Sequence, residues 1–282
     1  MRMRCLFAAI IALGATTTRA EEFRPRSLEI WPADVRLSGP AASQRLVVVG
    51  VDADGSRRDL TPSAKVESAS PQVATIDGRG RVAPMADGEG AVVVKAAGVE
   101  ARVPVRVAGS SLPRRVSFRH EVVPLLTKLG CNMGTCHGGQ HGKGGFRLSL
   151  LGFEPVPDFT AIVKSAESRR VTPFAPEESL LLLKPTLAVA HGGGRKIEVG
   201  SDEYELLWLW LEQGAPGPDA SEPEVDGLRV YPPARVLRPG EEQRLVVVAH
   251  HADGTERDVT DRAKFDSLGE GIARVSPRGV VK

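Results

Sequence analysis

Two stretches of the chain repeat the same order of apolar runs and turn-forming residues. Residues 44–83 align without a gap to residues 243–282, with 19 of 40 positions identical at a constant offset of 199. In the first stretch, the apolar runs Leu46–Val51 and Val73–Ile76 lie on either side of Asp54-Gly55. Asp-Gly between apolar runs favours a β-hairpin with a type I′ turn, and several short strands favour an antiparallel sandwich. The repeat therefore predicts two all-β domains.

The first copy contains two further apolar runs that the second copy lacks. Ala91–Lys95 and Ala101–Val107 predict two more strands in copy one, whereas copy two reaches only Lys282, the counterpart of Ala83. A sandwich without these strands leaves a sheet edge unpaired and half of its core exposed. We expect the second domain to be C-terminally truncated and this sequence to be the front part of a longer protein.

The segment between the copies, residues 115–219, has a helical pattern instead. Ser117 is positioned to cap a helix that begins at Phe118, with Pro124 near its first turn. Ser201 is positioned to cap a second helix, which Gly214 ends. Apolar residues repeat at helical spacing in this second helix, at Tyr204, Leu207, Trp208 and Leu211.

The N-terminus changes the charge and the cysteine count expected of the mature chain. Residues 1–20 combine early arginines, an apolar run from Cys5 to Leu13 and the small residue Ala20 before Glu21, which is the pattern of a secretory signal peptide. The alternative is the start of a buried helix. The full sequence has 37 Lys and Arg against 35 Asp and Glu, and cleavage after Ala20 removes three arginines and one of three cysteines. The mature charge is then −1, with two cysteines.

The charge, the length of the apolar runs and the predicted export indicate which partners and which location to expect. No clustered basic run remains after cleavage, so we expect no nucleic-acid partner. No apolar stretch has the roughly 18–20 residues of a membrane span, so we expect no transmembrane segment in the mature chain. Export predicts a periplasmic, extracellular or cell-surface location.

Both remaining cysteines and four of the six histidines lie in the middle segment. Cys131, Cys136 and His137 stand where a predicted helix ends. Covalent attachment of haem requires two thiols for the two vinyl groups and a histidine directly after the second thiol as iron ligand. The usual motif has two residues between the cysteines, whereas four intervene here. The pattern allows either a c-type haem site with a longer loop or a disulfide between the two cysteines.

The two repeats resemble the bacterial immunoglobulin-like (Ig-like) domains of group 2. That resemblance implies a sandwich of about 80 residues that serves as a spacer, an adhesion module or a carbohydrate-contacting module. It is carried by Asp54-Gly55, Asp59-Leu60-Thr61, Ala64, Ser68, Val73-Ala74, Gly80-Arg81-Val82, Gly88 and Gly90.

The middle segment resembles the cytochrome-c-like domains of large secreted planctomycete-type proteins, in which Ig-like and haem-like modules precede larger domains. The resemblance spans Phe118 to Pro218 and implies a mainly α haem domain. It is carried by Phe118, Val122, Pro124-Leu125-Leu126, Cys131, Cys136-His137-Gly138, Gly144 to Leu150, Ser179 to Leu182, His191 to Gly194 and Trp210 to Pro216.

The positions of the methionines narrow the choice of the second iron ligand. Methionines occur only at positions 1, 3, 85 and 133, so none follows the attachment motif. His191 lies where related domains place a distal ligand, and three glycines follow it; His141 and His120 are the alternatives. A bis-histidine iron has a lower reduction potential than a histidine–methionine iron. The candidates for pairing with haem propionates are Arg169, Arg170 and Arg195.

Two other interpretations of the same residues stay open. Two cysteines in an exported protein often form a disulfide, and a Cys131–Cys136 bond would close a short loop and leave His137 without a cofactor. Zinc bound through Cys131, Cys136, His137 and His191 has suitable ligand types, although the motif lacks a second cysteine pair.

We therefore expect a multidomain protein: an all-β Ig-like sandwich, a mainly α cytochrome-c-like domain and a truncated all-β Ig-like sandwich. Its expected function is electron transfer through one covalent haem c, with an unknown redox partner protein. The alternative is an adhesion or carbohydrate-binding protein that contacts a cell-surface polysaccharide or protein and has a disulfide-closed spacer. No catalytic constellation is visible. The predicted boundaries are 1–20 for the signal peptide, then 26–108, 115–219 and 226–282 for the three domains.

Overall fold

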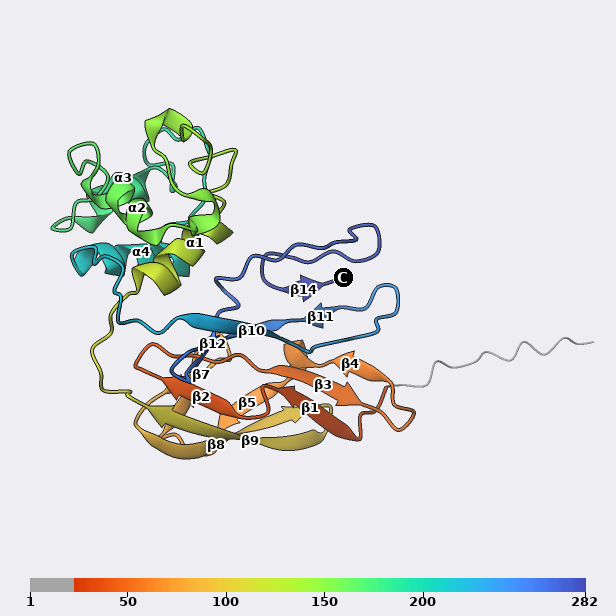
Figure 1. The fold of residues 1–282 in the computed structure, drawn as a ribbon. Helices are drawn as coiled ribbons and strands as arrows, with labels where there is room; N and C mark the ends of the chain where they lie inside the picture. The colour runs from red at the N-terminus through yellow and green to blue at the C-terminus, as the bar shows by residue number, and fades with distance from the viewer. Residues whose placement is uncertain (1–22) are drawn as a thin grey trace, which may run out of the picture.

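The computed structural model describes residues 23–282, so the predicted signal peptide at residues 1–20 lies outside the described residues. The chain forms two β-rich repeats and a middle segment that contains the helices (Figure 1). Within the described residues, no helix is long and apolar enough to cross a membrane.

The first repeat consists of two facing sheets and a small hairpin. One sheet has the antiparallel order β1-β3-β4, the other has the order β2-β9-β8-β5 with β2 parallel to β9, and β6 pairs with β7. The strands are β1 (Ser27–Trp31), β2 (Val35–Ser38), β3 (Val47–Val51), β4 (Arg57–Asp59), β5 (Lys65–Ser68), β6 (Ala74–Ile76), β7 (Val82–Pro84), β8 (Gly88–Ala96) and β9 (Val99–Ala108).

Alternation along these strands supplies the core of the first repeat. In β9, buried valines at positions 103, 105 and 107 alternate with exposed residues, as a half-buried strand requires. Val48 of β3 faces the same core, which contains only residues of this repeat. The first repeat therefore has a complete hydrophobic core of its own.

The turns of the first repeat differ in one respect from the sequence prediction. Gly55 has a φ of 80°, but Asp54 is not among the described residues with positive φ, so the expected type I′ turn at Asp54-Gly55 is wrong. Two consecutive positive φ angles occur instead at Ala97 (48°) and Gly98 (82°), where β8 turns into β9. The turn at Asp54-Gly55 differs from type I′ because the Asp52 carbonyl accepts the Gly55 N–H, which closes a longer loop.

The second repeat contains the sheet β10-β12-β13 and the pair β11-β14. The pairing of β10 with β12 reproduces that of β1 with β3: Tyr231 lies opposite Val246, as Trp31 lies opposite Val47. The strands are β10 (Val225–Tyr231), β11 (Gln243–Arg244), β12 (Val246–His251), β13 (Glu256–Asp258) and β14 (Val280–Val281).

The expected fold class is wrong, because the middle segment is not a mainly α cytochrome-c-like domain. Among residues 23–282, strand exceeds helix, and α4 is the only α-helix longer than six residues. The two predicted helices are present, at residues 118–128 and 202–212, and glycines with positive φ, Gly130 and Gly214, follow their ends. Residues 129–201 between them form short helical pieces and turns. The helices are α1 (Val123–Lys128), α2 (Pro155–Phe159), α3 (Leu180–Leu183) and α4 (Asp202–Glu212), with π-helical turns at Phe118–Val122 and Thr160–Lys164 and 3-10 turns elsewhere.

A separate core nevertheless holds the middle segment together. Trp210 of α4 is completely buried, its ring centroid lies 5.6 Å from that of Phe118, and its indole N–H donates to the Pro216 carbonyl over 3.0 Å. Leu207 and Leu211, on the same face of α4, are also completely buried. This core holds the elements on either side of the predicted haem loop.

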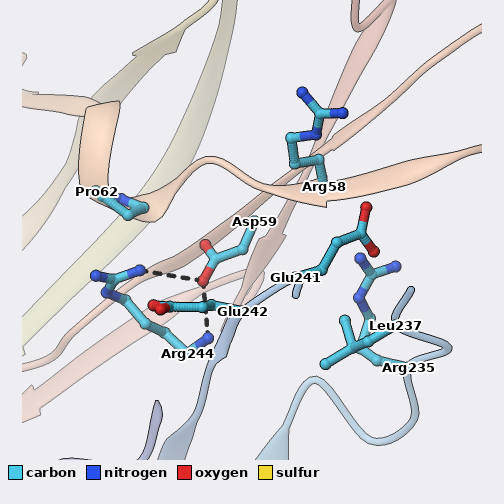
Figure 2. Close-up of a pocket in the computed structure, with 8 residues that line it drawn as sticks. All are labelled: Arg58, Asp59, Pro62, Arg235, Leu237, Glu241, Glu242 and Arg244. Atoms are coloured by element: carbon cyan, nitrogen blue, oxygen red, sulfur yellow. Dashed lines mark hydrogen bonds and ion pairs between the residues drawn. The ribbon is translucent and has the colours of Figure 1, made fainter. Parts of the chain in front are cut away.

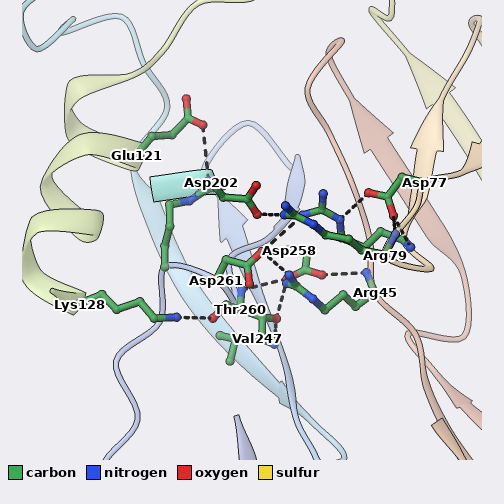
Figure 3. A network of polar contacts seen from close by, with 12 residues as sticks. Arg45, Asp77, Arg79, Glu121, Lys128, Asp202, Val247, Asp258, Thr260 and Asp261 are labelled. Carbon is green, nitrogen blue, oxygen red and sulfur yellow. Dashed lines mark hydrogen bonds and ion pairs between the residues drawn. The ribbon is translucent and has the colours of Figure 1, made fainter. Parts of the chain in front are cut away.

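The three parts pack against one another. The β10-β12-β13 sheet lies on the outer face of the β1-β3-β4 sheet, and the middle segment lies at one end of the paired repeats (Figure 1). Lys128 donates to the Thr260 carbonyl over 3.5 Å, and Arg79 forms an ion pair with Asp202 (Figure 3). The middle segment is therefore attached to both repeats.

Candidate functional site

The predicted haem loop begins where α1 ends. Gly130 has a φ of 76°, its N–H donates to the Thr127 carbonyl, and the Cys131 N–H donates to the Leu126 carbonyl over 2.9 Å. This pair of bonds is a Schellman motif, in which glycine takes the left-handed position. The motif turns the chain out of the helix at the first cysteine.

Backbone hydrogen bonds fold residues 131–138 into a compact loop. The His137 N–H donates to the Cys131 carbonyl over 3.0 Å, and the Gly138 N–H donates to the Met133 carbonyl over 3.0 Å. A Cβ atom on Gly138 would lie 2.0 Å from the Asn132 carbonyl oxygen, so this position requires glycine. The four residues between the cysteines thus form a closed turn, which brings His137 back to Cys131.

The structure describes Cys131 and Cys136 as free thiols. Burial raises the pKa of the Cys131 thiol to about 11, and the nearby Cys136 acts in the same direction. A thiol with this pKa is protonated at neutral pH and is a poor nucleophile. The charge of Lys196 acts in the opposite direction but does not offset burial, so Cys131 lacks the stabilised thiolate of a redox-catalytic cysteine.

The imidazole of His137 is held in one orientation. Its Nδ1 lies 2.9 Å from the Phe146 carbonyl oxygen, and the Phe146 ring lies 4.5 Å away between centroids. A carbonyl only accepts, so Nδ1 carries the proton and Nε2 keeps its lone pair. Burial lowers the pKa of His137, and the charges of His191 and Arg170 lower it further. The neutral imidazole that a metal requires is therefore the favoured form.

His191 has the same arrangement. Its Nδ1 lies 2.9 Å from the Gly194 carbonyl oxygen, which leaves Nε2 with a lone pair. His191 is near enough to His137 for its charge to affect the pKa of His137. A hydrogen bond from Nδ1 to a carbonyl is the outer-shell contact that orients metal-ligating histidines in general. Two thiols and two imidazoles with an available Nε2 are the donor types that a covalently attached haem would use.

Only one of the three predicted propionate partners lies beside this site. The Arg170 guanidinium lies 4.3 Å from the centroid of the Phe146 ring, which covers His137, and it donates to the Ala161 and Ser165 carbonyls. Arg169 is exposed, and Arg195 forms an exposed ion pair with Glu198. His141 is exposed as well.

The alternative ligand His120 lies elsewhere, at the contact with the second repeat. Its Nε2 atom lies 3.9 Å from Glu222 Oε2, and both atoms are buried without a hydrogen-bond partner among the described residues. Its ring meets the ring of His251 from β12. Sequence analysis missed this contact; the one signal was that His251 replaces Asp52 of the first repeat.

The four-ligand zinc site is not assembled. Among residues 23–282, no group of three or more His, Cys, Asp or Glu side chains is arranged to hold a metal ion. The disulfide alternative is not formed in this structure either, since both thiols are free.

A cavity lies between the two repeats (Figure 2), and the predicted haem loop does not line it. It measures about 290 Å³, and its charged side chains balance in number. Arg244 donates across it to Asp59, over 2.7 Å from the backbone N–H. Its lining residues are Arg58, Asp59, Pro62, Arg235, Leu237, Glu241, Glu242 and Arg244.

Comparisons with known proteins add little. No family model matches the chain, and no curated protein matches it. The chain is similar to two solved structures, domains 4 and 5 and domains 5–6 of the S-layer protein SbsC, each at 19% identity and a TM-score of 0.25. Each match covers 29% of this chain, and 51% and 43% of the S-layer chains. At this TM-score the likeness carries no argument about fold or function.

Proposed function

We propose that the middle segment carries one covalently attached haem c and that the protein transfers electrons. The observation that supports this proposal is that His137 and His191 make the same kind of hydrogen bond to a backbone carbonyl. Each imidazole holds Nδ1 against a backbone carbonyl at 2.9 Å and keeps Nε2 as a lone-pair donor. Two free thiols, Cys131 and Cys136, lie in the loop that ends at His137.

Four residues would hold the group. The Cys131 and Cys136 thiols would hold haem through thioether bonds, each formed by addition of S–H across one vinyl group, and His137 and His191 would supply the nitrogen ligands of the iron. When bound, haem supplies a one-electron couple between ferrous and ferric iron. A second histidine in place of methionine lowers the reduction potential, so we propose a low-potential centre.

The surrounding residues prepare the site. Phe146 orients His137 through its carbonyl and covers it with its ring, while Arg170 adds a positive charge next to that ring. A guanidinium at this place favours an anionic substituent such as a propionate. The roles of Arg169 and Arg195 stay predictions, because both side chains are exposed.

Export belongs to the same proposal. The predicted signal peptide at residues 1–20 places the mature protein in the periplasm, outside the cell or on its surface. Intact-mass measurement of exported protein tests this placement, and we expect a mature chain that begins at Glu21.

The deciding experiment is expression of the exported chain in a host that has the c-type cytochrome maturation machinery. We expect a pyridine haemochrome spectrum and a mass increment of one haem. Cys131→Ala and Cys136→Ala should each lose one thioether bond, which shifts the haemochrome band, and the double variant should lose the covalent haem. His141→Ala is the matched control, because this exposed histidine has no role in the proposal.

The distal ligand is tested separately. His191→Ala should keep the covalent haem but convert the low-spin spectrum to that of an iron with an open or water-filled sixth position. Apoprotein with an oxidised Cys131–Cys136 pair under the same conditions would refute haem attachment and support the disulfide-closed spacer. An unchanged low-spin spectrum in His191→Ala would refute only the assignment of His191.

A further inference from the structure

Two equivalent ion pairs join the repeats. The Asp258 carboxylate accepts the Arg45 backbone N–H over 2.8 Å and contacts Arg45 Nη1 at 3.3 Å. The Asp59 carboxylate accepts the Arg244 backbone N–H over 2.7 Å and contacts Arg244 Nη1 at 3.5 Å. Arg45 and Arg244 are counterparts at the offset of 199, and so are Asp59 and Asp258. Exchanging the two repeats therefore exchanges the two ion pairs.

The apolar contact between these ion pairs has the same symmetry. Val47 and Val49 of β3 pack with Val246 and Val248 of β12, and all four are at most 2% exposed. Trp31 and Tyr231, which are counterparts in the two repeats, pack against this cluster. Alternate residues of β3, such as Val48, face the core of the first repeat instead.

An interface in which the same patch is used on both sides is isologous, as in a twofold-symmetric dimer. We propose that the outer face of the β1-β3-β4 sheet, formed by Trp31, Arg45, Val47, Val49 and Asp59, is a homotypic docking surface whose partner is a second copy of itself. Within one chain, the second repeat occupies this surface. A first repeat that is separated from the second binds another first repeat through the same residues.

Asymmetric contacts set the preference between the two partners. Arg45 and Arg81 both form ion pairs with Asp261, whose counterpart in the first repeat is Pro62. A pair of first repeats lacks these contacts on both sides. The repeats of one chain therefore pair with each other in preference to a second chain, and the homotypic dimer is the weaker complex.

The first repeat is suitable for a test on its own. Its hydrophobic core contains only residues of this repeat, and its sheets are completed by its own strands. Separation exposes the apolar face of Trp31, Val47 and Val49, and an apolar patch on a soluble domain favours association.

The experiment is sedimentation equilibrium of the fragment 23–112. We expect a dimer, which Val49→Lys converts to a monomer with an unchanged circular dichroism spectrum, since Val49 lies outside the core of the repeat. Arg102→Glu, an exposed position on β9, is the matched control and should leave the dimer intact. A monomeric parent fragment at its highest soluble concentration would overturn the proposal.

Charge exchange tests the pairing itself. In a homotypic dimer, Arg45→Asp alone places two carboxylates together, and Asp59→Arg alone places two guanidinium groups together, so each folded variant should be monomeric. An equimolar mixture should form a heterodimer, because both contacts are then Arg–Asp pairs. A folded mixture that stays monomeric, or single variants that still dimerise, would contradict the assigned residues.

Two further variants cover the case in which a charge-exchange fragment fails to fold. Pro62→Asp restores the counterpart of Asp261 and should tighten the homotypic dimer about two- to fivefold. In the full chain, Arg45→Asp should lower the unfolding midpoint and Asp258→Arg should restore part of it, whereas no recovery in the double variant would refute the pairing.

Discussion

The imidazole of His120 in the middle segment meets the imidazole of His251 on β12 edge to face, with 5.4 Å between ring centroids. Glu222, Arg119 and Arg257 contribute charge around His120, and Asp253, Asp226 and Arg257 do so around His251. Burial is the largest influence on both rings and lowers the pKa of each. The contact between the middle segment and the second repeat therefore favours the neutral form of both histidines.

This contact predicts a loss of stability in mild acid. Because the pKa of each ring is lower in the folded chain than its ordinary value of 6.5, the unfolded chain binds protons more readily. The free energy of unfolding should be highest above pH 6.5 and should fall as the pH drops below it. Thermal unfolding between about pH 5 and 8 measures this slope.

His120→Gln and His251→Gln should each reduce the slope. They should not abolish it, because the pKa of His137 is lowered as well. His141→Gln is the exposed control and should retain the parent profile. A profile in which His120→Gln and the parent coincide would show that the contact does not titrate during unfolding.

Glu121 should be a costly charged residue to remove. Its carboxylate is 6% exposed and accepts two hydrogen bonds from Arg114 at 2.8 Å and one from the Ser117 N–H, and Arg262 lies 3.6 Å away. Burial alone would raise the pKa of Glu121, but the Arg114 and Arg262 charges hold it below its ordinary value. Glu121→Ala leaves two arginines facing each other and should cost about 3 kcal/mol in urea unfolding.

The control for Glu121 is an exposed ion pair of similar composition. Glu198→Ala removes the partner of Arg195 at the surface and should change the unfolding free energy by less than about 0.5 kcal/mol. Equal effects of Glu121→Ala and Glu198→Ala would refute the argument from burial.

Gly138→Ala should disrupt the cysteine loop. An added Cβ would lie 2.0 Å from the Asn132 carbonyl oxygen, so the backbone between Cys131 and His137 must shift. The expected results are a lower unfolding midpoint and a loss of covalent haem under maturation conditions. Gly134→Ala is the matched control in the same loop, because its Cβ would meet nothing within 4 Å. The same haem yield in both variants would show that the loop geometry does not matter for attachment.

Trp210→Ala should destabilise the middle segment by about 3–5 kcal/mol, since it empties the largest completely buried position of its core. Trp210→Phe keeps most of the packing but leaves the Pro216 carbonyl without its donor, which should cost about 1–2 kcal/mol. Urea unfolding measures both. Trp208→Phe, at a partly buried position on the same helix, should cost less than Trp210→Phe; the reverse order would contradict the burial described here.

Local signals predicted local structure correctly. Ser117 and Ser201 were expected as helix caps, and their hydroxyls accept the N–H groups of His120 and Tyr204. Capping depends on three or four consecutive residues, so the sequence alone suffices. The predicted apolar face of the second helix was less accurate. It included Trp208, whereas the completely buried tryptophan is Trp210, which contacts Phe118.

Long-range structure could not be predicted in the same way. The expectation of a mainly α middle segment was wrong because residues 129–201, between the two predicted helices, form short helical pieces and turns, for which the periodicity of apolar residues gives no signal. The contact of His120 with His251 joins residues far apart in the sequence. The closeness of His191 to His137 was expected from family resemblance, and no spacing rule supplies it.

Lys128 and Asp202 of the middle segment bind Thr260 of one repeat and Arg79 of the other. Because one contact goes to each repeat, the position of the middle segment depends on both repeats and not only on its two chain connections. The placement of His137 and His191 is therefore linked to the pairing of the repeats, and a change in that pairing would be expected to move both histidines.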